Sequence, residues 1–280
     1  MNVAITGASG FLGRALSDRL RAAGHDVTAV SLRTQPPAEL LKDCQAVVNL
    51  AGEPVAQRWT PAARERIANS RIQGTRSLVA ALRRHPPAVL VSASAVGYYG
   101  SRGDEVLTED SPPGADFLGQ LAVAWEQEAQ AAEQFGVRVV TPRIGVVLGG
   151  DGGALAQMLP PFRLGVGGRL GTGEQWMSWI ALDDLVSLVE FAIATTALSG
   201  PVNAVAPNPV TNTVFTRELA AALHRPAILP LPALALRILF GEMSQILLGG
   251  QRVSPQAALR AGFQFRFADL GQALAHAVAG

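Results

Sequence analysis

The sequence predicts an α/β fold in which helices cover both faces of a doubly wound parallel sheet, followed by a small, mainly helical C-terminal region. Two patterns predict it. Short apolar, β-branched runs alternate with amphipathic helical segments over most of the chain, as in βα units that bury a parallel sheet on both faces. In the first of these units, glycines at positions 7, 10 and 13 separate the strand from the helix.

The segment from residue 3 to residue 13 has the spacing of a dinucleotide-binding turn, because a buried strand passes directly into the glycines and then into a helix. The first glycine permits a tight bend, the second admits the backbone close to a pyrophosphate, and the third lets the helix pack on the strand. The helix N-terminus adds unpaired N–H groups and a positive dipole end. We therefore predict a Rossmann-type domain, with an ordinary glycine turn as the alternative. The predicted cofactor contacts here are Gly7, Ser9, Gly10, Phe11, Leu12 and Gly13.

The second strand, residues 26–31, ends where the adenosine ribose lies in this architecture. The hydroxyl of Ser31 and the guanidinium of Arg33 lie at this end, without a carboxylate that would bind a ribose 2′-hydroxyl. These two side chains suit a 2′-phosphate, so the sequence favours NADP over NAD. The alternative for Arg33 is a solvated loop arginine, since most arginines lie on the surface.

The third strand, which starts at residue 45, ends in a turn of small residues. Pro36 and Pro37 break the chain before it, and a short helix is expected at residues 38–42. Leu50, Ala51 and Gly52 then follow the strand at the carboxyl edge of the sheet, where open α/β folds bind ligands. Their small bulk suits backbone contact with the adenosine and phosphates of the cofactor.

A long helix is predicted over residues 60–84, with Thr60 as its cap and Pro61 as its first residue. Arg71 lies part-way along this helix. It reaches the cofactor if residues 70–75 pack near the carboxyl edge of the sheet, and it is an ordinary surface charge if they do not. The sequence leaves these two interpretations open.

The fourth strand, residues 88–91, delivers a hydroxyl-rich loop to the same edge of the sheet. The loop spans residues 92–100 and contains Ser92, a predicted cofactor contact, followed by Ser94, Tyr98 and Tyr99. The last two are the only tyrosines in the chain. Catalytic residues of open α/β sheets are expected on loops in this position.

The segment at residues 142–149 is expected to lie beside the nicotinamide, with Arg143 and Val147 in contact with it. It follows a helix predicted at residues 116–135 and a strand at 137–141. Beyond it, a helix over residues 155–164 is expected to be interrupted at Pro160 and Pro161. A helix from residue 180 to 194, a strand at 202–205 and a helix at 216–223 complete this part.

The C-terminal part differs from the rest of the chain because it consists mainly of short predicted helices. They are expected at residues 232–240, 243–248, 254–260 and 270–277. We expect a nucleotide-binding domain over residues 1–228 and a helical subdomain over residues 229–280 that covers the substrate side.

The composition excludes several classes of partner and location. A net charge of +1 argues against nucleic acid. The most apolar late run, residues 229–240, is cut by prolines and Arg237, so we expect no membrane span, and the absence of a signal-peptide pattern suggests the cytoplasm. Cys44 is the only cysteine, which excludes an intrachain disulfide, and no residue spacing typical of a metal site occurs.

With these motifs in view, the chain resembles the extended short-chain dehydrogenase/reductases. It is most similar to an atypical subgroup whose members are usually labelled nucleoside-diphosphate-sugar epimerase family proteins. The resemblance rests on residues 6–13, 49–53, 70–75, 92–100, 142–149, 179–184 and 249–255. It implies NADP(H) binding through the glycine turn, Ser31 with Arg33, Leu50 with Ala51, Arg71 and the segment near Val147. It also implies a small-molecule substrate, for which a sugar nucleotide is one candidate. Helical surfaces in this fold often pair, so an oligomer is a further expectation.

The chain departs from the family at the catalytic motif. Ordinary members use Tyr-x-x-x-Lys, in which the lysine lowers the pKa of a tyrosine acid/base, but the only lysine here is Lys42. Ser94 matches the family's catalytic serine, and Tyr98 or Tyr99 is a hypothetical substitute proton donor whose pKa Arg143 would lower. Two functions stay open: an NADP-dependent oxidoreductase or sugar-nucleotide epimerase with an altered proton-transfer group, and a non-catalytic NADP(H) sensor or scaffold.

Overall fold

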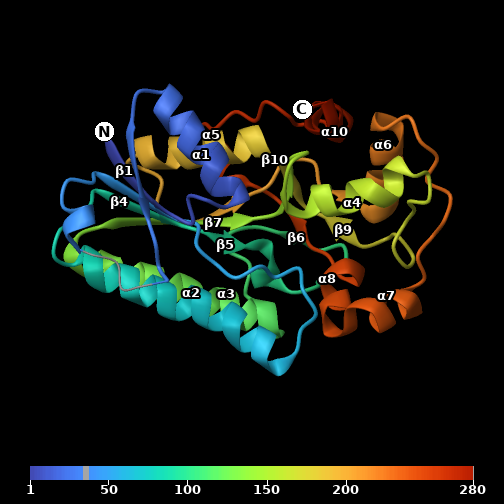
Figure 1. Cartoon of the computed structure of the whole chain (residues 1–280), viewed down its shortest axis with the longest axis horizontal. Coiled ribbons are helices and arrows are strands. Elements are labelled where there is room, and N and C mark those ends of the chain that lie inside the picture. Colours follow the sequence, from blue (N-terminus) through green and yellow to red (C-terminus); the bar gives the residue numbers. More distant parts are fainter. Residues whose placement is uncertain (34–37, 280) are drawn as a thin grey trace.

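The computed structural model describes residues 1–33 and 38–279, so the predicted break at Pro36 and Pro37 lies outside the described residues. Its central parallel sheet has the strand order β11-β7-β4-β3-β1-β2, and a short strand β5 also pairs with β7 (Figure 1). This confirms the predicted doubly wound sheet. The bounds are β1 Asn2–Thr6, β2 Asp26–Val30, β3 Ala46–Asn49, β4 Val89–Ser92, β5 Ser94–Ala95, β7 Arg138–Ile144 and β11 Gly200–Ala204.

Helices cover both faces of this sheet, as Figure 1 shows. Helices α1 (Phe11–Ala22) and α5 (Leu182–Ala194) lie on one face, and α2 (Pro61–Leu82) and α3 (Phe117–Gln130) lie on the other. Neighbouring strand residues point to opposite faces, so Ile5 packs in the core beneath α1 and α5 while Ala4 packs in the core beneath α2. This two-sided burial accounts for the unbroken apolar strands.

Local sequence signals set several helix boundaries. Thr60 caps α2 as predicted, because its hydroxyl accepts a hydrogen bond from the Ala63 amide at 3.2 Å. The predicted interruption at Pro160 and Pro161 is wrong, since helix α4 runs unbroken from Gly153 to Arg163. Leu155, Leu159 and Phe162 of α4 are all buried in one cluster, and this packing outweighs two missing backbone donors.

Short strand pairs and 3₁₀ turns connect these layers. β8 (Val146–Leu148) pairs with β10 (Trp179–Ala181), so the helix expected from residue 180 begins only at Leu182. The other pairs are β9 (Trp176–Met177) with β12 (Val210–Thr211) and β6 (Val106–Leu107) with β13 (Arg252–Val253). The 3₁₀ turns are Ala38–Leu41, Val96–Tyr99, Ala131–Phe135 and Gly241–Met243.

The C-terminal third is mainly helical, as predicted. It contains α6 (Asn212–Ala222), α7 (Ala233–Phe240), α8 (Ser244–Leu248), α9 (Gln256–Arg260) and α10 (Leu270–Ala279). α9 packs on β11 and α10 packs on α6, so this region adds to the same body as the sheet. No helix among the described residues combines the length and apolar character needed to cross a membrane.

Candidate functional site

The predicted dinucleotide turn after β1 touches the turn after β3. Gly7 has a positive φ of 70°, and a Cβ there would lie 2.9 Å from the backbone of Leu50 and Ala51. A Cβ on Gly13 would overlap the carbonyl oxygen of Gly7. Both positions therefore require glycine, and their backbones form one continuous surface at the carboxyl edge of the sheet.

The N-terminus of α1 opens onto this surface. Gly10 is the N-cap residue, so no side chain caps the first amides of the helix, while the Gly10 amide closes the turn by donating to the Gly7 carbonyl at 2.9 Å. The Arg14 guanidinium donates to the Ser9 carbonyl at 2.7 Å. Uncapped amides and a cation beside them favour an anion. Arg14 was not predicted from the sequence. It could have been noticed because a cation in the first turn of a helix is disfavoured by the helix dipole and therefore suggests a nearby anion.

A buried hydrogen-bond network holds the two turns in register. The Thr6 hydroxyl donates to the Asn49 side-chain oxygen at 2.6 Å and accepts from the amides of Leu50 and Ala51 at 3.2 and 3.3 Å. The Asn49 amide group in turn donates to the hydroxyls of Thr75 (2.9 Å) and Ser92 (3.1 Å). Ser92, predicted as a cofactor contact, is thus a buried member of the network that fixes the strand ends.

Arg71 lies beside the β3 turn. Its Nη1 donates to the carbonyls of Glu53 at 2.9 Å and Ile67 at 3.2 Å, and its Cζ lies 5.1 Å from the centre of the Trp125 ring. A Cβ on Gly52 would lie 3.1 Å from that Cζ. Burial lowers the pKa of Arg71 to about 10, against the opposing charge of Glu53. Residues 70–75 therefore pack near the carboxyl edge of the sheet, and contact between Arg71 and the cofactor stays a prediction.

Other predicted cofactor contacts lie on either side of the glycine turn after β1. At the end of β2, the Arg33 amide donates to the Ser31 hydroxyl at 3.2 Å, and the Arg33 side chain is exposed. On the other side, Val147 is buried in β8. The Phe11 ring packs against Gly149, which follows β8, so that segment folds over the start of α1. A side chain at Gly149 would displace the ring.

A second polar cluster lies at the ends of β5 and β7. Glu126 of α3 and Arg143 of β7 form a buried ion pair with two parallel hydrogen bonds of 2.9 Å, and their side chains are only 6% and 3% exposed. The Ser94 hydroxyl donates to the same carboxylate at 2.6 Å. Hydrogen bonds that fully satisfy the carboxylate and the guanidinium make this burial tolerable.

Tyr99 extends this cluster into β11. Its buried hydroxyl donates to the Asn203 side-chain oxygen at 2.6 Å and accepts from Arg143 Nη1 at 2.9 Å. Burial raises the pKa of Tyr99 to about 12, outweighing the opposite effect of Arg143. The hypothesis that Arg143 gives Tyr99 a lowered pKa is therefore wrong. Burial also disfavours the charge of Arg143. Its hydrogen bonds to Glu126 and the negative charge of that carboxylate outweigh this effect, so the pKa of Arg143 lies above its ordinary value.

Tyr98 has a different environment. The guanidinium carbon of Arg143 lies 3.4 Å from the centre of its ring, which is only partly buried and meets Tyr99 edge-on. Within the described residues its hydroxyl forms no hydrogen bond, whereas the hydroxyls of Ser94 and Tyr99 are both engaged. Tyr98 is thus the predicted catalytic residue with a free hydroxyl.

Three members of the cluster were not predicted from the sequence: Glu126, Asn203 and Glu109. The Glu109 carboxylate accepts from the amides of Asn203 and Ala257, each at 3.0 Å, and so joins the loop before α3 to β11 and α9. Glu126 could have been noticed as a charge on the apolar face of its helix. For Asn203 and Glu109 no local pattern signals the role. Across residues 1–33 and 38–279, no three His, Cys, Asp or Glu side chains converge as metal ligands.

Comparison with known proteins identifies the family. The model of the NAD dependent epimerase/dehydratase family matches residues 3–204. The chain belongs to this family. Epimerase family protein Mb2239 of Mycobacterium bovis is 46% identical over 291 residues, which cover 98% of this chain and 97% of that relative. The predicted resemblance to extended short-chain dehydrogenase/reductases is thereby confirmed. A second family model, described as a domain of unknown function (DUF1731), matches residues 231–277.

Solved structures of epimerase family members superpose on the whole chain. The crystal structure of human epimerase family protein SDR39U1 (isoform 2) with NADPH has a TM-score of 0.91 and 38% identity, with full coverage of both chains. A nucleoside-diphosphate sugar epimerase from Corynebacterium glutamicum has a TM-score of 0.83 and 36% identity, over 99% of this chain and 58% of that one. The epimerase-family fold therefore extends through the C-terminal helices.

Proposed function

We propose that this protein is an NADP(H)-dependent oxidoreductase or epimerase that acts at an alcohol or carbonyl carbon of a small molecule, with a sugar nucleotide as the substrate class. The observation that carries the proposal is the pair of touching turns after β1 and β3, where Gly7 and Gly13 leave no room for a Cβ. Family membership and the sugar-nucleotide epimerase from Corynebacterium glutamicum support the substrate class.

The residues at the sheet edge fit the cofactor. The uncapped amides after Gly10 would hold the pyrophosphate, and Arg71 would lie beside the nucleotide at the β3 turn. Ser31 and the exposed Arg33 would hold a 2′-phosphate, since β2 ends without a carboxylate to repel it. The NADPH in the structure of the human relative supports this choice.

Bound NADP(H) supplies the hydride exchange, and the protein must supply the proton. We assign that proton transfer to Tyr98, whose hydroxyl is the free one. The guanidinium of Arg143 lies against the face of its ring and holds the ring in position. Ser94 and Tyr99 are positioning residues in this proposal. The hydroxyl of Ser94 holds the Glu126 carboxylate, and the hydroxyl of Tyr99 holds the Arg143 guanidinium.

A non-catalytic NADP(H) sensor or scaffold is the second candidate. Two observations favour it: the chain has no Tyr-x-x-x-Lys motif, and the hydroxyl at the family's serine position, Ser94, donates to Glu126. Cofactor binding would then be retained and turnover absent.

Fluorescence titration with NADPH and NADH tests the cofactor. We expect NADPH to bind at least tenfold more tightly, and Arg33→Glu to remove that preference while Arg83→Glu, an exposed arginine at the end of α2, leaves it unchanged. Equal affinity for the two dinucleotides, or none for either, would contradict the proposal.

Turnover separates the two candidates. Purified protein is mixed with NADPH and a panel of carbonyl compounds, and separately with NADP⁺ and uridine diphosphate sugars, whose alcohol carbons must first be oxidised. We expect turnover in the wild type, loss of at least a hundredfold in Tyr98→Phe with NADPH affinity intact, and a smaller loss in Tyr99→Phe. Tight NADPH binding without turnover of any compound would favour the sensor or scaffold.

A further inference from the structure

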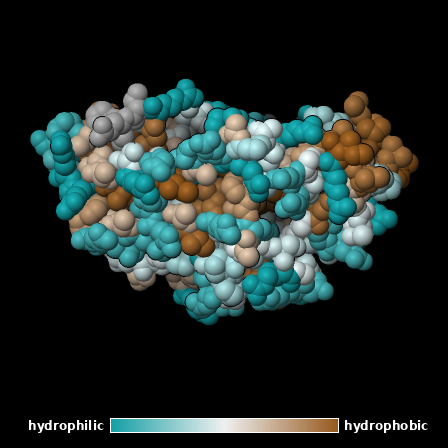
Figure 2. Space-filling model, turned by 90° about the horizontal axis from the view of Figure 1, so that it is seen from below, coloured by the Kyte–Doolittle hydropathy of each residue, from teal (hydrophilic) through white to brown (hydrophobic). Residues whose placement is uncertain are grey.

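The end of the molecule that holds α4, α6 and α7 carries an exposed apolar surface, which Figure 2 shows as a concentration of hydrophobic colour. We call it the apolar tip. Its side chains protrude into solvent instead of lining a groove: Leu164 is 79% exposed and Ile228 is 73% exposed. The tip consists of Leu164, Val166, Ile228, Leu234, Ile238 and Leu239.

The segments that form the tip are held together by their backbones. Leu170 and Leu231 form a β-bridge, in which the Leu231 amide donates to the Arg169 carbonyl and the Gly171 amide donates to the Leu231 carbonyl, each at 2.9 Å. α7 follows directly, and only Leu236 of that helix is buried. The remaining leucines and isoleucines of α7 therefore form a surface that nothing in the described chain covers.

Charge within the segments of the tip has a single sign. Arg163, Arg169, Arg225 and Arg237 lie in its segments and are all exposed. Residues 152–173 and 219–241 contain no aspartate or glutamate. The acidic side chains that border the second segment are already paired: Glu218 with Arg217 and Glu242 with Arg64, each at 2.9 Å. Outside these segments, the exposed Asp151 and Glu174 border the first one. An apolar surface whose own segments carry arginines and no carboxylate is complementary to an apolar surface that carries anions.

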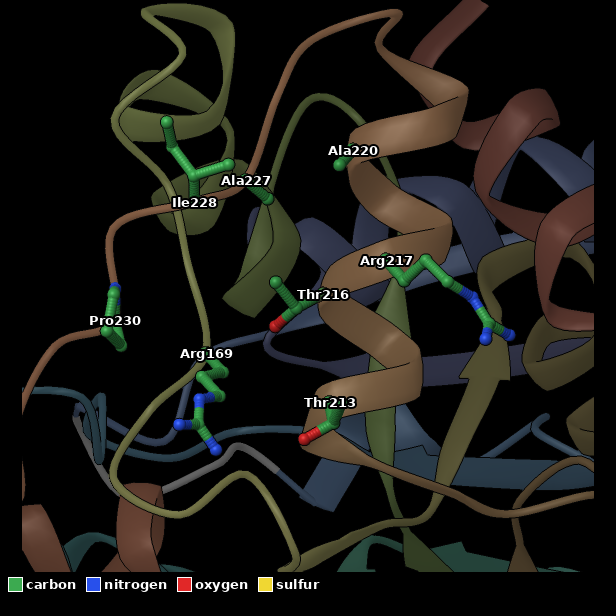
Figure 3. A pocket seen from close by; sticks show the side chains of 8 residues that line it. All are labelled: Arg169, Thr213, Thr216, Arg217, Ala220, Ala227, Ile228 and Pro230. Atoms are coloured by element: carbon green, nitrogen blue, oxygen red, sulfur yellow. The ribbon is translucent and has the colours of Figure 1, made fainter.

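A pocket of about 290 Å³ opens beside the tip, between α6 and residues 227–230 (Figure 3). The Thr216 hydroxyl points into it, and the exposed Arg169 side chain lies at its edge, with Nη1 on the Thr172 carbonyl. Arg217 also lines the pocket, but Figure 3 shows its guanidinium turned away. The pocket thus places a hydroxyl and a guanidinium within reach of a phosphate at the edge of the tip.

We propose that the apolar tip docks this protein on the surface of an anionic lipid bilayer, with aliphatic side chains in the interface and the arginines on lipid phosphates. A second copy of the chain fits less well, because a two-fold contact would set these arginines against one another without a carboxylate between them. A protein partner would favour aromatic anchors, whereas the tip is aliphatic and protruding. This docking is peripheral and independent of the proposed function.

Sedimentation with lipid vesicles tests the proposal. Full-length protein is mixed with vesicles of phosphatidylcholine alone or with about one third phosphatidylglycerol, at low and high salt. We expect binding to the anionic vesicles only, weakened by salt. Each arginine near the surface should contribute about fivefold to the partition coefficient, so Arg163→Gln, Arg169→Gln and Arg237→Gln together should lower it roughly a hundredfold.

Matched variants separate the tip from the rest of the surface. Leu234→Gln, Ile238→Gln and Leu239→Gln together should abolish vesicle binding. Arg21→Gln, Arg83→Gln and Arg84→Gln, three exposed arginines of α1 and the end of α2, should leave it within twofold of the wild type. NADPH affinity and the thermal midpoint confirm that each variant is folded.

Three outcomes would overturn the proposal. The first is no sedimentation with either kind of vesicle. The second is equal binding by the wild type and the tip variants. The third is a dimer in light scattering that the leucine and isoleucine changes dissociate, because the tip would then be an interface between two copies of this chain.

Discussion

At the scale of single residues, the most informative feature is the buried ion pair of Glu126 and Arg143. It lies beside Ser94 and Tyr99, two of the predicted catalytic residues, and each of its charges is satisfied by the other and by neighbouring hydroxyls. Such a pair is costly to break, because the remaining charge stays buried without compensation. We therefore interpret it as the frame that holds Tyr98.

Glu126→Gln should destabilise the protein by about 3–5 kcal/mol, because it leaves the Arg143 cation in the interior without a counter-ion. Urea denaturation measures this change. Glu128→Gln, two residues further along α3, is the matched control: its carboxylate pairs with the exposed Arg76, and the change should affect stability little. Similar costs for both variants would refute a special role for the buried pair.

The pKa of Tyr99 predicts an alkaline effect on stability. Its folded-state pKa is raised from 10.0 to about 12, so between these values the unfolded chain loses this proton while the folded chain retains it. Stability should therefore be complete below pH 10 and fall as the pH rises towards 12. Tyr99→Phe should remove this part of the fall.

The Tyr98→Phe variant makes the Tyr99 titration directly visible, because it leaves a single tyrosine. The ultraviolet absorbance of the phenolate should then appear near pH 12 in the folded protein. A midpoint near 10, the ordinary value, in a protein that is still folded would show that Tyr99 is not buried as described.

At this scale the sequence could predict which residue types gather at the sheet edge, and less about what each does. Ser94, Tyr98 and Tyr99 were predicted together because one strand delivers them to one loop. Their partners Glu126 and Asn203 come from α3 and β11, distant in the sequence. The distinction between an engaged hydroxyl and a free one depends on those partners, so it could not be read locally.

At the scale of elements, the βα unit at the N-terminus depends on the absence of side chains at two glycines. Gly13 lies in the first turn of α1 against the Gly7 carbonyl, whereas Gly74 lies within α2 and has only the Leu32 side chain near it, at 3.5 Å. Both are helical glycines, but only the first is in close contact with backbone.

Replacing each of these glycines by alanine should have opposite effects. Gly13→Ala should destabilise the protein and weaken NADPH binding at least tenfold, because its methyl group would displace the Gly7 turn. Gly74→Ala should stabilise by about 0.5–1 kcal/mol, since alanine is the better helix former. Thermal denaturation and NADPH titration check both. If Gly13→Ala bound NADPH normally, the close packing of α1 on the turn would not be needed for the site.

The start of α2 was predictable, and the behaviour of the prolines in α4 was not. Thr60 followed by proline is a local capping signal, and the structure realises it. Pro160 and Pro161 also carry a local signal, for an interruption, but Leu159 and Phe162 are buried in a cluster that holds the helix together. Local propensity therefore decided where α2 begins, and tertiary packing decided that α4 continues through its two prolines.

At the scale of the whole molecule, Asp184 joins the C-terminal segment to the sheet. This buried carboxylate in the first turn of α5 accepts hydrogen bonds from the amides of Arg266 and Phe267 at 2.8 and 2.9 Å. α10 follows this contact and packs on α6. The adjacent Asp183 is exposed and contacts His276 and Arg266 only at the surface.

Asp184→Ala should cost about 3 kcal/mol and accelerate hydrogen exchange at residues 266 and 267 and in α10, because two amides lose a charged acceptor. Asp183→Ala should leave exchange in the same residues nearly unchanged. Hydrogen exchange measured by mass spectrometry distinguishes the two variants. Equal protection in both variants would mean that packing alone holds the C-terminal segment.

The division into domains at residues 228 and 229, a cytoplasmic location and an oligomeric state remain predictions. The C-terminal part contacts the central sheet through α9, which packs on β11, and it contacts the loop before α3 through the pairing of β13 with β6, so the predicted division concerns function more than folding. Unfolding followed by probes in both parts tests it: a single transition is expected, and two separate transitions would show that the parts fold independently.

The sequence by itself determined the order of the βα units, the glycine turn at their start and the absence of Tyr-x-x-x-Lys, because each is a property of neighbouring residues or of composition. Only the tertiary structure decided that Glu126 neutralises Arg143 and that Tyr99 is buried. It also decided that, within residues 1–33 and 38–279, the hydroxyl of Tyr98 has no partner and nothing covers the exposed face of α7. The physical reason is that burial and electrostatic pairing depend on distances between groups from remote parts of the chain, and those distances exist only once the sheet and its helices have packed.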